Sequence, residues 1–164
     1  MRNAAQVGLG FMVAVLVGSA ASAGAESAKG TIAYKGNSVT VQHAYLVKGP
    51  DAVDEKKILK RIVLATKDLK AKLDACKAMS CSDGDLGEGM TIDLDGGPRV
   101  NYWVVFKDQM VQYSGTADPA TFKITADDAG KITGSFTVDD SGAGGAKIDV
   151  TFDATLVKEL TSAR

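Results

Sequence analysis

Alternation of apolar and polar residues is the feature that most limits what this chain can fold into. In the run 147–156 every second residue is apolar: Ile148, Val150, Phe152, Ala154 and Leu156. A period of two places all of them on one side of a pleated strand. One buried and one solvated face is typical of antiparallel sheets. The same pattern predicts a strand over 131–138 and a long one over 38–47, with Ala44 and Leu46 on the wet side of the latter.

Turn residues separate these runs where hairpins need them, for example Lys35-Gly36-Asn37 and 95–98. The pattern predicts about nine closely spaced strands, which favours an antiparallel β barrel or β sandwich. The expected strands cover 31–34, 38–47, 56–66, 90–94, 100–106, 110–115, 122–126, 131–138 and 147–156.

One α-helix is expected to pack against this sheet. Leu69, Leu73, Cys76 and Met79 recur at helical spacing, and Asp68 can cap the first turn. Cys76 would lie on the buried stripe, with the second cysteine just beyond the helix end.

Residues 1–25 have the pattern of a cleaved secretory signal peptide. Arg2 supplies a positive start, residues 7–17 are all apolar or glycine, and Ala21-Ser22-Ala23 fits a small-residue cleavage site. The alternative is a membrane anchor, but a spanning helix needs about 20 apolar residues and this run is shorter. We therefore expect a periplasmic or secreted protein in which 26–164 form a single domain, without a stable membrane span.

The expected export predicts how the two cysteines are used. Cys76 and Cys81 are separated by four residues, and disulfides persist in oxidising compartments. The expectation is one short-range disulfide. A metal or redox pair is the alternative, but it would ordinarily have a two-residue spacing.

Charge and motifs exclude several classes of function. The formal net charge is −1, and no basic cluster suggests nucleic acid or an anionic membrane as a partner. The chain carries no cofactor-binding motif, so no cofactor is expected.

His43 is the only histidine. A single imidazole can act as a general base, which makes His43 a candidate catalytic residue of a hydrolase-type enzyme. The competing interpretation is a hydrogen-bonded histidine in or near the core. No G-x-S-x-G nucleophile motif precedes a helix here, and both thiols are assigned to the disulfide.

Acidic and sulfur-containing residues suggest two possible metal sites. Asp83, Asp85 and Glu88 lie within six residues in a glycine-rich segment, with Asp93 and Asp95 further on, and carboxylates suit calcium. Neither stretch matches the EF-hand loop, and solvated turns have the same composition. Copper is a further candidate; its ligands would be His43, Met79, Met90 and Met110.

Aromatic residues are the candidates for ligand or partner recognition. Tyr102, Trp103 and Tyr113 belong to two adjacent strands that carry apolar side chains on both faces. Either the helix covers the outer face of these strands, or these aromatics form an exposed patch or a lined cavity.

Two segments, 43–51 and 90–99, resemble a group of small uncharacterised secreted proteins of bacteria, across most of the chain after residue 25. The resemblance implies a Gram-negative periplasmic or secreted setting and no assigned activity. The expected function is therefore a non-enzymatic binding module for a small apolar ligand or a protein partner. The alternatives are a hydrolase that uses His43 and a calcium-binding protein.

Overall fold

The computed structural model describes residues 27–83, 87–94, 99–107, 109–116 and 120–164. The predicted signal peptide, Asp85 and Asp95 lie outside these residues. The strands are β1 (Ser27–Tyr34), β2 (Asn37–Thr40), β3 (His43–Pro50), β4 (Ile58–Ala65), β5 (Gly89–Leu94), β6 (Arg99–Phe106), β7 (Gln109–Thr116), β8 (Phe122–Asp128), β9 (Lys131–Asp139) and β10 (Lys147–Glu159). The helices are α1 (Lys70–Ala75) and the 3-10 turns η1 (Met79–Ser82) and η2 (Ser141–Ala143).

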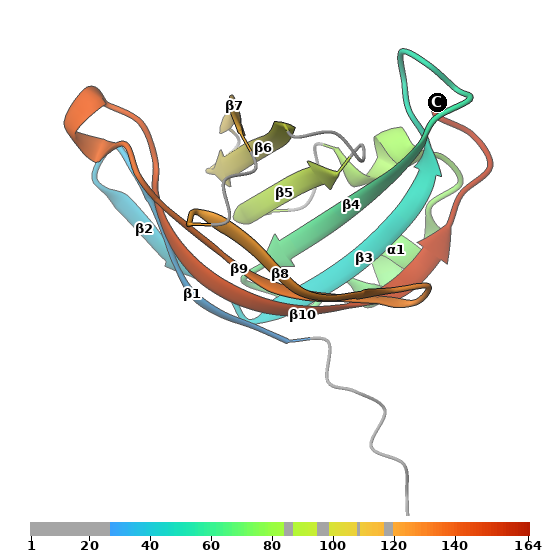
Figure 1. Cartoon of the computed structure of the whole chain (residues 1–164), viewed down its shortest axis with the longest axis horizontal. Coiled ribbons are helices and arrows are strands. Elements are labelled where there is room, and N and C mark those ends of the chain that lie inside the picture. The colour runs from blue at the N-terminus through green and yellow to red at the C-terminus, as the bar shows by residue number, and fades with distance from the viewer. Residues whose placement is uncertain (1–26, 84–86, 95–98, 108, 117–119) are drawn as a thin grey trace, which may run out of the picture.

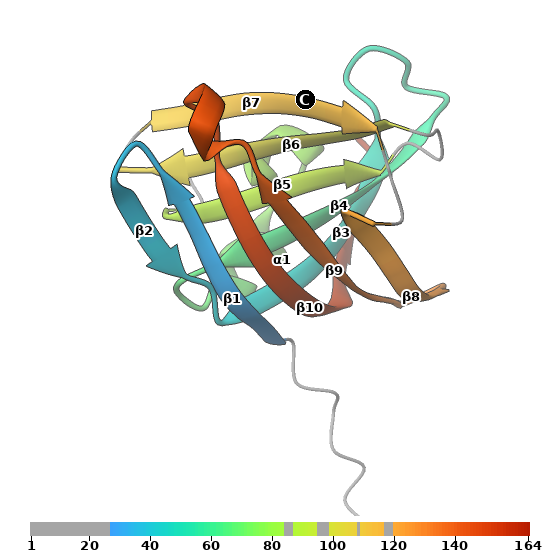
Figure 2. The same cartoon turned by 60° about the vertical axis from the view of Figure 1, so that its left-hand side comes forward.

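The described strands form one mixed sheet in the order β2-β1-β10-β3-β4-β5-β6-β7, with β9 on β10 and β8 on β9. The mainly β class with one α-helix is confirmed. Ten strands lie in the described residues, where about nine were predicted, and β3 pairs with β10 in parallel, so the sheet is mainly rather than purely antiparallel. Figure 1 shows the sheet curving from β1 and β10 through β3 and β4 to β5–β7. Figure 2 shows β1, β8, β9 and β10 crossing in front of β4–β7, so that the two halves face each other.

The interior between the halves is filled by the alternating residues of both. On β10 the apolar residues Ile148, Val150, Phe152 and Ala154 are all buried, as the period of two predicts. Six rings follow one another through this interior with centroid separations between 5.0 and 6.3 Å: Tyr34, Tyr113, Tyr102, Phe136, Phe122 and Phe152.

The predicted long strand over 38–47 is wrong, because the chain changes partners at Val41 and Gln42. The Val41 N–H donates to the Gly30 carbonyl, whereas the Gln42 N–H donates to the Ala65 carbonyl of β4. β3 then has two buried faces: Ala44 and Leu46 face the interior, where a wet side was predicted.

The other buried face of β3 and β4 is covered by α1, η1 and the C-terminal segment. Tyr45, Val63, Leu73, Cys76 and Met79 form a second apolar cluster there. The predicted helical stripe is therefore buried, but the helix has only six residues. It ends because Cys76 has an extended conformation (ψ 140°), and Met79 begins a separate 3-10 turn.

Gly30 allows β1 to lie close to β10. A Cβ atom at this position would be 2.0 Å from the Asp149 carbonyl oxygen, and the backbone has φ +125°, which side-chain-bearing residues avoid.

The disulfide between Cys76 and Cys81 is confirmed and joins the end of α1 to η1. Replacing Cys76 by alanine and Cys81 by serine should lower the free energy of unfolding by about 2 kcal/mol, because the open chain gains loop entropy when unfolded. Urea unfolding of the variant, and of the native protein with and without reductant, measures this. Equal midpoints for the oxidised and reduced native protein would contradict the expectation.

Candidate binding site on the outer face of β4–β7

The strand register places a group of polar and aromatic side chains next to one another on the outer face of β4–β7. Trp103 of β6 lies opposite Thr91 of β5 and Gln112 of β7. One step along the strands, Asp93 lies opposite Arg61 of β4. Residues directly opposite each other in antiparallel strands are neighbours on the same face.

These side chains line a pocket of about 380 Å³. The loop between β3 and β4 contributes Asp51 and Val53 to its wall, and β7 contributes Met110. Val53 is 97% exposed and Met110 is 48% exposed. Trp103 itself is half-buried. The pocket thus combines an aromatic ring with an apolar rim and several polar groups.

Arg61 is the centre of a buried charge network beside this pocket. Its Nε donates to Asp93 Oδ1 at 2.6 Å and its Nη2 to Asp93 Oδ2 at 2.7 Å. Its Nη1 donates to Ser82 Oγ at 2.9 Å and to the Met79 carbonyl at 3.3 Å, and it also contacts the Asp83 carboxylate. Arg61 and Asp93 are 7% and 6% exposed. The bidentate pair joins β4 to β5, and the Nη1 bonds of Arg61 tie η1 to the sheet.

Burial and charge shift the pKa values of this network in defined directions. Desolvation lowers the pKa of Arg61, but the Asp93 and Asp83 carboxylates outweigh it, so the net shift is upward. Desolvation raises the pKa of Asp93, against the opposing effect of Arg61. Asp51 behaves differently: the backbone N–H groups of Asp54 and Val53 hold the pKa of its carboxyl below the ordinary value. Asp51 is therefore ionised at neutral pH.

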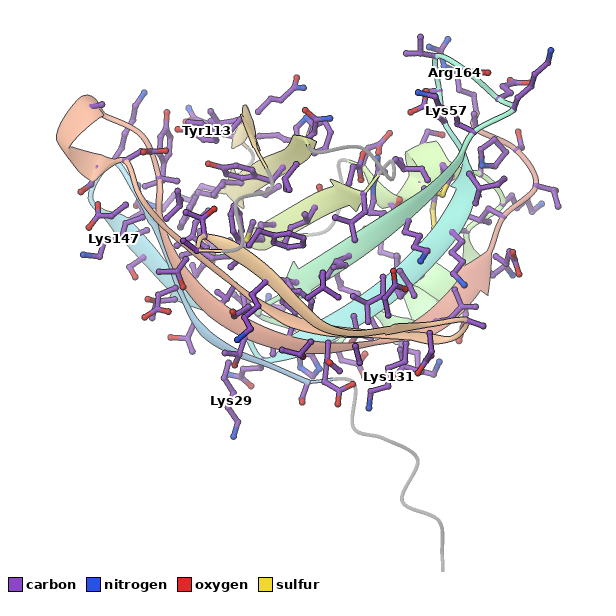
Figure 3. The ribbon with its side chains drawn as sticks, viewed as in Figure 1. Lys29, Lys57, Tyr113, Lys131, Lys147 and Arg164 are labelled. Carbon is purple, nitrogen blue, oxygen red and sulfur yellow. A yellow bond between two sulfur atoms is a disulfide. The ribbon has the colours of Figure 1, made fainter. Side chains whose placement is uncertain are left out.

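The three aromatic residues predicted to bind a ligand are separated by the sheet. The rings of Tyr102 and Tyr113 stack at 5.4 Å on the interior side, whereas Trp103 points into the outer pocket. Burial, followed by a hydrogen bond with Tyr34, raises the pKa of Tyr113 to about 12. Tyr113 lies toward the β7 end of the molecule in Figure 3. Trp103 alone of the three belongs to the pocket.

His43 lies away from this pocket. It pairs with Ala65 of β4, whereas the β4 residues that line the pocket, Leu59 and Arg61, lie toward the other end of that strand. Its ring is parallel to that of Tyr45 at a centroid distance of 6.2 Å. The Tyr45 hydroxyl donates to Asp68 Oδ1 at 2.6 Å, and the same oxygen accepts the Lys70 N–H at 2.8 Å. Asp68 is not the N-cap that the sequence predicted: the N-cap is Leu69, and Asp68, one residue earlier, accepts the Lys70 N–H and anchors Tyr45.

Two of the described residues considered for calcium, Asp83 and Asp93, are paired with Arg61. Asp83 contacts Nη1 of that guanidinium, Asp93 accepts from its Nε and Nη2, and Glu88 is half-buried. Within the described ranges, no group of three or more His, Cys, Asp or Glu residues is arranged to hold a metal ion.

The methionines considered for copper lie in three different surroundings. Met79 packs in the cluster under α1, Met90 in the interior, and Met110 at the pocket rim. The structure does not bring them together with His43.

The pairing of Arg61 with Asp93 is the feature of the site that the sequence analysis did not predict. The signal was only partial: Arg61 follows Lys60 and precedes the apolar run Ile62, Val63 and Leu64, and of the two adjacent charged residues only Arg61 is buried. A buried charge needs a partner. The identity of that partner, thirty-two residues away, depends on the fold.

Comparisons with protein-family models, with curated proteins and with solved structures found no match. No helix among the described residues is long and apolar enough to cross a membrane.

Proposed function

We propose that this protein is an exported, non-enzymatic binding module that holds a peptide segment of a protein partner at the Trp103 pocket. The observation that carries the proposal is the apolar rim. Two of the three large apolar residues that are exposed in the described chain, Val53 and Met110, border the pocket that contains Trp103. Exposed apolar groups around an aromatic side chain are typical of protein contact sites.

The position of β7 favours an extended peptide over a compact small molecule. In the described part of the chain β7 pairs with β6 alone, which leaves its outer edge for an added strand. Met110 and Gln112 of β7 line the pocket. A strand added at this edge would therefore place alternate side chains beside the pocket.

Export is part of the proposal because a disulfide is stable in an oxidising compartment. Binding without catalysis is favoured because His43 is not among the residues that line the pocket, and it pairs with Ala65 at the other end of β4 from Leu59 and Arg61. The interior is a less suitable place for an apolar ligand, since buried side chains from both halves of the sheet occupy it.

The test is a selection of random peptides on the immobilised protein, followed by titration. Trp103 is the only tryptophan, so its emission reports directly on the pocket. We expect recovered peptides to change that emission, and we expect Trp103→Ala to weaken their binding by about tenfold or more, as loss of an aromatic anchor does. Circular dichroism checks that the variant remains folded.

A matched pair of surface variants controls for general loss of apolar area. Met110→Ser removes an exposed apolar side chain at the pocket, and Ile58→Ser removes one that does not line it. Binding should weaken in the first and stay unchanged in the second. Equal affinity of the selected peptides for all four proteins would place their site elsewhere and contradict the proposal.

A further inference from the structure

The charge of the Trp103 pocket indicates which side chain of the partner enters it. Among its described lining residues, the carboxylates of Asp51, Asp83 and Asp93 face one guanidinium, that of Arg61. The lining therefore carries two net negative charges. No lysine is among these residues.

The one positive charge in this sum, that of Arg61, is not available to an incoming anion. Both Asp93 oxygens accept hydrogen bonds from it, and Ser82 and the Met79 carbonyl accept others. These internal partners engage Nε, Nη1 and Nη2, so the guanidinium is already committed within the fold. An anionic ligand would find the cation of the pocket neutralised.

The carboxylates of Asp83 and Asp51 are both accessible. Asp83 contacts Arg61 Nη1 through Oδ1, but its side chain is 47% exposed. Asp51 lies on the loop between β3 and β4, and its Oδ1 accepts the N–H groups of Val53 and Asp54 at 2.7 and 3.0 Å. These bonds keep Asp51 ionised and fix its carboxylate at the pocket wall.

Trp103 adds a second attraction for a cation. The electron-rich face of an indole attracts ammonium and guanidinium groups. The carbon of the Arg61 guanidinium already lies 5.9 Å from the centre of the Trp103 ring. The pocket thus contains one internal example of the contact that a basic ligand would make.

The basic side chains labelled in Figure 3 do not line the pocket. Figure 3 shows Lys29, Lys131 and Lys147 along the outer side of the strands that face β4–β7, and Lys57 at the corner near Arg164. Lys57 is on the same loop as Asp51 but does not line the pocket. An approaching positive group is therefore drawn toward the pocket and away from the opposite layer.

We infer that the pocket receives an arginine or lysine side chain of the bound peptide, held between the Trp103 ring and the carboxylates of Asp51 and Asp83, with Val53 and Met110 covering its aliphatic part. This inference rests on the proposed peptide-binding function. Such a side chain suits the site because its stem is apolar and its end is charged.

The test uses the peptides recovered on the native protein and dependent on Trp103. We expect them to share an arginine or lysine, and we expect its replacement by citrulline or norleucine, which removes the charge, to weaken binding by about tenfold or more. Titration of Trp103 emission with acetyl-arginine amide, and with neutral acetyl-citrulline amide, checks the side chain alone.

A matched pair of variants tests the protein side. Asp51→Asn removes the charge at the pocket and keeps an oxygen that accepts the loop N–H groups. Asp128→Asn removes a charge from the turn between β8 and β9, where Asp128 Oδ1 accepts the Gly130 N–H at 3.1 Å. Asp51→Asn should weaken binding of the basic peptide and leave its citrulline version unaffected, whereas Asp128→Asn should change neither.

The outcomes separate the two proposals. Peptides that depend on Trp103 but share no basic residue, or equal effects of Asp51→Asn and Asp128→Asn, would overturn the basic-side-chain inference and leave peptide binding in place. Failure to recover any peptide that depends on Trp103 would overturn both.

Discussion

Replacing Asp93 by alanine is expected to lower the free energy of unfolding by about 3–5 kcal/mol, because it leaves the Arg61 guanidinium buried without its bidentate partner. Arg61 is only 7% exposed although it lines the pocket, so water can replace little of the bidentate hydrogen bonding. Asp83 remains as a contact, but its side chain is half exposed and reaches Nη1 alone. Urea unfolding followed by circular dichroism measures the loss.

The control for Asp93→Ala removes both charges. A double variant, Arg61→Met with Asp93→Leu, fills the site with apolar volume and should be much closer to the native protein in stability than Asp93→Ala is. If Asp93→Ala were as stable as the native protein, the guanidinium would not be buried as described. If the double variant were the less stable of the two, the ion pair itself would be the stabilising element.

This dependence on a distant partner marks the limit of what the sequence could predict. The faces of β10 could be predicted because one face packs on the interior and the other meets solvent, so that alternation and burial agree. β3 could not, because Tyr45 and Ala44 are both buried on opposite faces. The second face is buried because α1 and η1 pack against it. Alternation along a strand does not indicate whether another element covers its second face.

The candidate site was predictable only in part for a related reason. Period two places Tyr102 and Trp103 on opposite faces, and the structure agrees. The sequence does not say which of these faces is the interior, nor that the loop carrying Asp51 and Val53 comes to lie beside Trp103. Those facts follow from the order of β4–β7 in the sheet, which joins segments far apart in the chain.

The helix shows how a correct pattern can give a wrong length. Leu73, Cys76 and Met79 are buried together, as helical spacing predicts. The chain nevertheless leaves the α-helix at Cys76, and the disulfide to Cys81 joins its end to η1. Spacing predicted which residues share a side of the segment, but not that two short turns rather than one helix would present them.

Replacing Phe136 by alanine is expected to produce a loss as large as that of Asp93→Ala, about 3–5 kcal/mol, by opening a cavity in the interior. Phe136 is 4% exposed and lies between Tyr102, at a centroid distance of 5.0 Å, and Phe122, at 5.6 Å. Both neighbours meet it edge to face, so a smaller residue loses ring contacts as well as buried area. Phe136→Leu keeps more of the volume and should lose less stability.

The same variant distinguishes the packed interior from the outer pocket. An apolar cavity of this kind stays dry and admits small aromatic molecules, so benzene should raise the thermal midpoint of Phe136→Ala and leave the native protein unchanged. Peptide binding at Trp103 should persist in Phe136→Ala while it is folded, because Phe136 lies in the interior cluster and Trp103 lines the outer pocket. Stabilisation of the native protein by benzene would mean that its interior already has a space for an apolar ligand. That result would move the binding site from the outer face of β4–β7 to the space between the two halves of the sheet.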